Sequence, residues 1–170
     1  KIAIKNYILI MLKNIKIGKF DFKINEKGKS PSYYCSKKTN ICINKSIINK
    51  LITIFKRNKK TFRICLHGSN KEKIHCMIVV MGKKDKTKAH KHLLKTEYYY
   101  IHYGKVDLLT FEAKKNKYKK YSMNPNSTFF FKMINNKYHQ VIPRSNVVIY
   151  SEIRNGPFKE NDSILQNKQS

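Results

Sequence analysis

The chain has 170 residues, of which 41% are hydrophobic and 12% aromatic, and its formal net charge is +27. This length suits one domain with an ordinary core, and the apolar content excludes a wholly disordered protein. No stretch reaches the roughly 18 apolar residues that a membrane span needs. We therefore expect no membrane span.

The positive charge favours a polyanion partner, but its distribution weakens that interpretation. Of the 37 Lys and Arg residues, only four are Arg, and the Lys residues are spread over the whole length. Arg makes the bidentate contacts with bases and phosphates that Lys cannot make. We therefore attribute the charge to a general bias in composition rather than to nucleic-acid binding. A surface selected to bind polyanions is the alternative. In both cases the charge draws anions towards any cleft.

The cysteines show no metal-binding or redox spacing. Cys35, Cys42, Cys65 and Cys76 form no C-x-x-C pair. Without a secretory signal, they predict reduced thiols in a cytoplasmic protein.

Residues 1–60 are predicted to form an N-terminal extension. Residues 1–12 are apolar enough for a strand or a short helix docked on the body, and 13–45 read as loops with short extended pieces such as 19–24. From Ser46 the apolar residues follow helical spacing, which predicts a helix over about 46–57 with Ser46 as its N-cap. We expect this helix to pack across the β-structure.

After Lys60 the pattern changes to short extended runs rich in Val, Ile, Phe and Tyr. They cover 61–67, 73–81, 86–92, 97–103, 105–112, 117–123, 128–134, 138–142 and 146–153. No helical pattern separates them, so the sequence predicts a mainly β domain, an antiparallel sandwich or small barrel over 61–158. Residues 159–170 are polar and are predicted to form a flexible tail.

Four residues in this β-region have the chemistry of metal ligands. His90 and His92 are at positions i and i+2, so a strand presents both imidazoles on one face. Glu97 follows shortly afterwards, and His139 lies in a later apolar stretch. Three imidazoles and a carboxylate suit one divalent transition metal such as Fe, Mn, Ni, Co or Zn.

The order His90, His92, Glu97 and Gly104 resembles the first motif of the cupin superfamily, which is H-x-H, three or four residues, E, six residues, G. Membership would imply an antiparallel jelly-roll β-barrel whose two His and Glu bind a metal, completed by a His from a second motif. His139 is the candidate for that fourth ligand. In the second motif, Ile134 and Asn136 stand where Pro and Gly are usual, and Pro143 stands where Asn is usual. Asn tolerates the left-handed turn conformation, so the turn can survive.

A narrower resemblance extends over roughly residues 60–160. The order Arg63-x-x-x-His67, then the H-x-H motif, then Glu152-x-x-x-G-P-F looks like the WbuC family of cupin metalloproteins, found among genes for O-antigen and related surface polysaccharides. The resemblance implies a carbohydrate or nucleotide-sugar ligand and, weakly, a homodimer. Arg63 and His67 are candidates for substrate binding, and a structural role for His67 is the alternative.

The reaction class stays open at this point. An isomerase, epimerase or oxygenase is possible, and a base would have to come from Glu152, His67 or an inward tyrosine such as Tyr99. A non-catalytic sugar-binding module with the same fold is the alternative. His102 has the opposite strand parity to Glu97 and is predicted to face away from the site.

Overall fold

The structure is a computed structural model that describes residues 7–8, 10–12, 23–25, 30–35, 40–112 and 117–166. Within these ranges the chain is mainly β, as predicted. The strands are β1 (Lys23–Asn25), β2 (Ser32–Tyr34), β3 (Phe62–Cys65), β4 (Ile74–Met81), β5 (His90–His92), β6 (Glu97–Tyr103), β7 (Val106–Phe111), β8 (Tyr118–Met123), β9 (Phe130–Met133), β10 (Tyr138–Pro143), β11 (Val148–Asn155) and β12 (Ser163–Leu165). Helix α2 covers Lys45–Asn58, and a short 3-10 helix, η1, covers Glu160–Asp162. Each predicted extended run overlaps one of these strands, and β10 and β11 extend one and two residues beyond their predicted runs.

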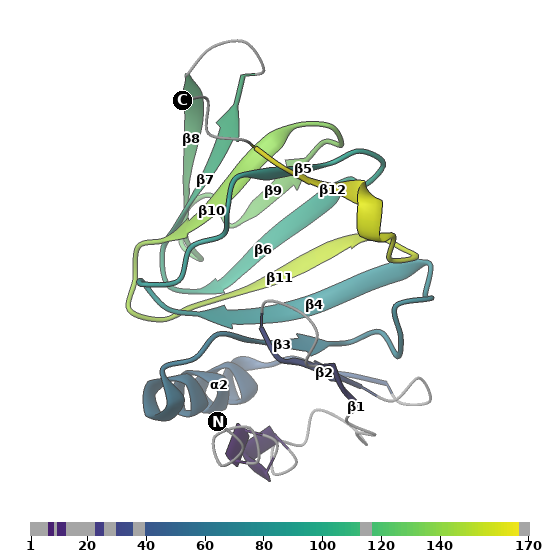
Figure 1. The fold of residues 1–170 in the computed structure, drawn as a ribbon. Coiled ribbons are helices and arrows are strands. Elements are labelled where there is room, and N and C mark those ends of the chain that lie inside the picture. The colour runs from purple at the N-terminus through teal and green to yellow at the C-terminus, as the bar shows by residue number, and fades with distance from the viewer. Residues whose placement is uncertain are drawn as a thin grey trace.

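The strands form two sheets that face each other (Figure 1). The first has the order β1-β2-β3-β4-β11-β6-β9, and the second has the order β12-β5-β10-β7-β8. All described pairs are antiparallel except β2 with β3. The jelly-roll prediction is confirmed, with one correction. In the described part of the chain the ladders leave two separate sheets rather than one closed barrel, so side-chain packing joins them.

The seven-stranded sheet is buried on both faces around β4, which explains the uninterrupted apolar run of this strand. Met77, Val79 and Met81 point into the space between the sheets, whereas Ile78 and Val80 point towards α2. Side-chain alternation along a strand produces this division. Helix α2 lies along the β3 and β4 side of this sheet, away from the five-stranded sheet (Figure 1).

Helix α2 confirms the predicted helix, but its cap is two residues earlier than expected. Asn44, with φ −128° and ψ 174°, accepts a hydrogen bond from the Ile47 N–H at 3.0 Å, as an N-cap side chain does. Ser46 already lies inside the helix, so its prediction as the cap was wrong. The buried residues Ile47, Leu51 and Phe55 form part of the apolar face that contacts the sheet.

Both ends of the chain contain structure that the sequence pattern did not fully specify. Residues 7–8 and 10–12 are helical, and Ile8 and Leu12 are buried in the α2-side core, which selects the helix among the two options for 1–12. Within the piece predicted over 19–24, residues 19–22 lie outside the described residues, and β1 begins at 23. No helix in the described ranges is long and apolar enough to cross a membrane.

Part of the segment that was predicted to be a flexible tail forms the strand β12. Ser163–Leu165 pairs with β5, and the Leu93 N–H donates to the Asp162 carbonyl at 3.0 Å. These backbone hydrogen bonds fix the segment despite its polar composition. The division into segments 1–60, 61–158 and 159–170 stays a prediction, and the sheets cross both of its boundaries.

Candidate metal centre

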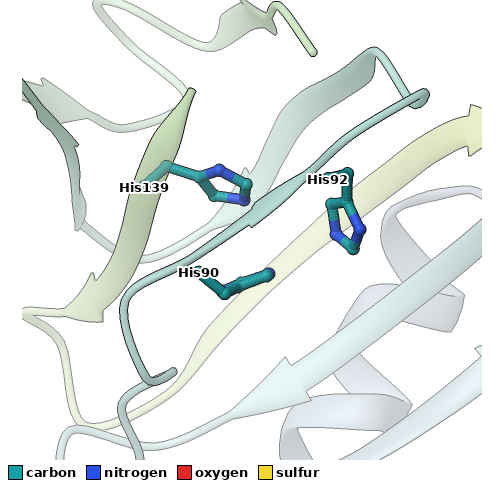
Figure 2. Close-up of side chains that lie close together, drawn as sticks. All are labelled: His90, His92 and His139. Atoms are coloured by element: carbon teal, nitrogen blue, oxygen red, sulfur yellow. The ribbon is translucent and has the colours of Figure 1, made fainter. Parts of the chain in front are cut away.

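Three histidines converge between the sheets from two neighbouring strands of the five-stranded sheet. His90 and His92 lie on β5, and His139 lies on β10 directly opposite His90 in the antiparallel register. One nitrogen of each ring lies within 4.8 Å of those of the other two. Figure 2 shows the three imidazoles directed towards a common space. His90 and His92, two residues apart on β5, therefore present their rings on the same face of the strand, as strand periodicity predicts.

Glu97 reaches this group from β6, on the opposite sheet. Its Oε1 lies 3.1 Å from Nε2 of His92, and its Oε2 lies 3.0 Å from Nε2 of His139. The side chain is 1% exposed. Burial raises the pKa of Glu97, but its contacts with His139 and His92 outweigh burial and hold the pKa well below its usual value. The carboxylate is therefore ionised beside two imidazoles.

The backbone fixes the orientation of two of the rings. Nδ1 of His90 lies 2.8 Å from the Lys88 carbonyl, and Nδ1 of His139 lies 3.0 Å from the Lys137 carbonyl. Because a carbonyl only accepts, each Nδ1 must carry the proton in these contacts. In the neutral imidazole, Nε2 then presents its lone pair, which is how second-shell contacts prepare histidine for a metal.

The geometry around His139 provides a direct test of whether these residues fit a cation. Its Nε2 is buried and makes no well-aligned hydrogen bond, although Glu97 is so close. A lone pair facing a carboxylate needs a positive charge, either a proton or a metal ion. Burial lowers the pKa of His139, but Glu97 outweighs this effect and raises it. The pKa of His90 falls to about 4 through burial and the proximity of His139, so His90 is neutral at pH 7. The residues therefore fit a divalent ion, because imidazole nitrogens and a carboxylate are ligands that such an ion accepts.

Two turns of the motif have the backbone conformation that their positions require. Gly104 has φ +81°, and a side chain there would collide with the Val147 carbonyl. Asn136 has φ +57°, which confirms that Asn can replace the usual glycine. The Asn136 N–H donates to the His92 carbonyl at 2.6 Å, so this turn ties the second motif to the first.

Arg154 is a site residue that the sequence analysis missed. Its Nη1 lies 3.4 Å from Glu97 Oε1, 3.4 Å from Glu152 Oε1 and 3.5 Å from His92 Nε2. It stands opposite Glu97 in the β11–β6 register. The sequence does contain one signal for Arg154. It is two residues after Glu152 on the same strand, so the two side chains point to the same face. Arg154 brings a permanent positive charge to the edge of the histidine group.

Asp162 and Lys95 are two further charged residues that the sequence did not single out. Asp162 Oδ2 lies 3.5 Å from His92 Nδ1 and 3.6 Å from Lys95 Nζ, and its Oδ1 accepts a hydrogen bond from the Leu94 N–H at 2.9 Å. Both side chains are buried. Burial and then Arg154 lower the pKa of Lys95. Asp162 comes from the segment predicted to be a tail, so no local pattern identified it.

The two proposed catalytic residues both lie in the interior beside this group. The Tyr99 hydroxyl donates to Glu97 Oε2 at 2.7 Å, and burial with the nearby Glu97 raises the pKa of Tyr99 well above its usual value. Tyr99 is thus a hydrogen-bond donor rather than a base in this arrangement. Glu152 is half-buried and forms an ion pair with Arg154. Their catalytic roles stay predictions.

The predicted substrate-binding pair, Arg63 and His67, makes contacts inside the protein. Arg63 Nη1 donates to the Ser30 hydroxyl at 2.8 Å. His67 is buried and stacks on His75, with ring centroids 4.3 Å apart and an interplanar angle of 3°. Burial lowers the pKa of both imidazoles. His102 faces away from the site, as predicted, and its Nε2 lies 2.7 Å from the Ser151 hydroxyl.

No protein-family model and no curated protein matches the chain at the sequence level. Among solved structures, CapF bound to the inhibitor 3-isopropenyl-tropolone is similar over 59% of this chain and 30% of its own, with 12% identity and a TM-score of 0.53. The capsular polysaccharide assembling protein CapF from Staphylococcus aureus is similar over 57% of this chain and 27% of its own, with 12% identity and a TM-score of 0.51.

These similarities identify the class of fold. The chain spans about 30% of the length of the CapF structures that it matches. The neighbours are cupin-fold proteins, which agrees with the two facing sheets and with the placement of His90, His92 and His139. The cupin-type fold is therefore confirmed, whereas the narrower assignment to the WbuC family stays a prediction.

Proposed function

We propose that this protein is a metal-binding cupin of the WbuC type that acts on a carbohydrate or nucleotide-sugar of surface-polysaccharide metabolism. The observation that carries the metal-binding part is the convergence of His90, His92 and His139 opposite the ionised Glu97. Glu97 would be the fourth ligand. A divalent ion held there would polarise a ligand oxygen or lower the pKa of a bound water.

The residues around the histidines support an anionic ligand. Arg154 and Lys95 are both cations, and each lies within 4 Å of a carboxylate of the site. A phosphate group entering the site could take over part of these contacts, because Arg and Lys bind phosphate through charge-assisted hydrogen bonds. In this arrangement Arg154 is the cation beside the histidines, while Arg63 is held by Ser30. Polysaccharide metabolism is proposed from the motif resemblance, and CapF, a fold neighbour, is itself described as a capsular polysaccharide assembling protein.

The proposal is tested with the protein reconstituted with each candidate divalent metal. The reconstituted protein is incubated with UDP- and dTDP-linked hexoses, and binding and turnover are followed by ligand-observed NMR. Turnover that is lost in His92→Ala and retained in His102→Ala supports an enzyme. Binding without turnover supports the alternative, a non-catalytic sugar-binding module. A metal-loaded protein that neither binds nor converts these ligands contradicts the carbohydrate proposal.

A further inference from the structure

Among the described residues, most of the carboxylates that would offset the lysines are buried or half-buried. Glu97, Asp107 and Asp162 are buried, and Glu152 is half-buried. Asp85 is half-buried and accepts hydrogen bonds from the Thr61 hydroxyl and the Gly82 N–H. Since these acidic groups serve the interior, the exposed surface is more cationic than the net charge of +27 alone implies.

One part of this surface carries a cluster of exposed aromatic rings. Glu97, Tyr99 and Ile101 of β6 point between the sheets, so the alternate residues Tyr98 and Tyr100 point outwards. They meet two residues of the β9 segment to form what we call the aromatic face, which consists of Tyr98, Tyr100, Phe129 and Phe130. Ring centroids are 5.9 Å apart for Tyr98 and Phe130, and 5.7 Å apart for Tyr100 and Phe129.

The aromatic face is accessible on the described structure. Tyr100, Phe129 and Phe130 are 40%, 47% and 50% exposed. Helix α2 covers the β3 and β4 side of the sheet and leaves the β6 and β9 side open (Figure 1). Strand β9 is the last strand of this sheet in the described chain. Neighbouring exposed rings of this kind mark interaction surfaces rather than scattered surface residues.

The charge decides which partner fits this face. Lys132 is exposed on β9 and stands opposite Tyr98 in the register. A second copy of the chain would bring another strongly cationic molecule to the same place, and the two would repel each other. A nucleic-acid strand with unpaired bases matches both features, because bases stack on aromatic rings and phosphates attract lysines. The scarcity of Arg disfavours sequence-specific hydrogen bonds to the edges of bases. It does not disfavour the stacking of bases on aromatic rings, which tolerates any sequence.

We propose that the aromatic face binds single-stranded nucleic acid without sequence specificity. The test compares a fluorescein-labelled 12-nucleotide oligo(dT) with a 12-base-pair duplex, by fluorescence anisotropy over a series of salt concentrations. A purely electrostatic surface binds the duplex at least as tightly, because its charge density is higher. We expect the single strand to bind more tightly than the duplex. Equal or tighter binding of the duplex would overturn the proposal.

Variants of unchanged charge isolate the stacking contribution. Tyr100→Ala combined with Phe130→Ala should weaken oligo(dT) binding about 10-fold or more, with the salt slope and the duplex affinity unchanged. Phe130→Tyr should retain binding, and Tyr118→Ala, which removes an exposed ring on β8, serves as the matched control. An unchanged oligo(dT) affinity in the double variant would overturn the proposal. So would sedimentation showing a dimer that this variant converts to a monomer, because the face would then be a self-association surface.

Discussion

Asp162 Oδ2 lies 3.5 Å from Nδ1 of His92, and both side chains are buried. The contact links the last described strand region to the strand that carries two of the three clustered histidines. A carboxylate at this position favours a protonated Nδ1, so that the lone pair of His92 Nε2, which lies beside Glu97 and Arg154, would be available to a metal. Lys95 contacts the same carboxylate, with its Nζ 3.6 Å from Asp162 Oδ2.

Asp162→Asn should therefore weaken metal affinity by about 10- to 100-fold, the usual cost of losing a second-shell partner. Competition with a chromophoric chelator measures this affinity. Asp107→Asn is the matched control, because Asp107 is also a buried carboxylate but pairs with Arg144 at 2.7 Å, away from the histidines. Equal losses of metal affinity in the two variants would mean that Asp162 affects metal binding only through the overall stability of the protein.

Tyr99→Phe should destabilise the fold, because Glu97 would lose the hydroxyl that donates to its Oε2 at 2.7 Å. We expect the free energy of unfolding of the metal-free protein to fall by about 2 kcal/mol, as for a buried hydrogen bond to a charged group. Chemical denaturation measures this value. Tyr118→Phe, at an exposed position, should change it by less than about 0.5 kcal/mol, and a similar result for Tyr99→Phe would refute the assigned contact.

Asn44→Ala should destabilise helix α2, since Asn44 accepts the hydrogen bond from the Ile47 N–H. The expected loss is about 1 kcal/mol in the free energy of unfolding, again from chemical denaturation. Ser46→Ala should have little effect, because alanine is a better helix former at an interior position. If Ser46→Ala were the more damaging change, the helix would begin where the sequence pattern placed it.

Thiol labelling should distinguish Cys42 from the other cysteines. Cys42 is exposed, whereas burial raises the pKa of Cys35 and of Cys65 to about 12 and also raises the pKa of Cys76. Only the thiolate reacts, so iodoacetamide at pH 8 should modify Cys42 first in the folded protein. Peptide mass spectrometry identifies the modified residue, with a guanidinium-unfolded sample as the control. Rapid modification of Cys35 or Cys65 without unfolding would contradict their burial.

The parts of the fold that the sequence predicts are those with a local signal. Alternation and short apolar runs locate β3 to β11, and helical spacing locates α2. The H-x-H spacing places His90 and His92 on one face, because strand geometry alone fixes that relation. The convergence of His139 depends on the β5–β10 pairing, and only the motif resemblance predicted it.

The residues that sequence reasoning missed depend on register between distant segments. Arg154 enters the site because β11 lies beside β6, and Asp162 enters because β12 pairs with β5. Parity with Glu152 indicates which face of the strand Arg154 points to, but not its contact with Glu97, and Asp162 has no periodic pattern near it. The segment 159–166 looks like a polar tail because its order comes from backbone hydrogen bonds to β5 and its neighbours rather than from apolar burial.

The measurement that tests the metal centre most directly is elemental analysis by mass spectrometry of the wild-type protein, His139→Ala and His102→Ala. We expect about one divalent transition metal per chain in the wild type and in His102→Ala, and a large loss in His139→Ala. His102 is the control because its ring lies on the outer face against Ser151. A wild-type protein that holds no metal after reconstitution with Fe, Mn, Ni and Zn would contradict the metal centre, as would an unchanged metal content in His139→Ala.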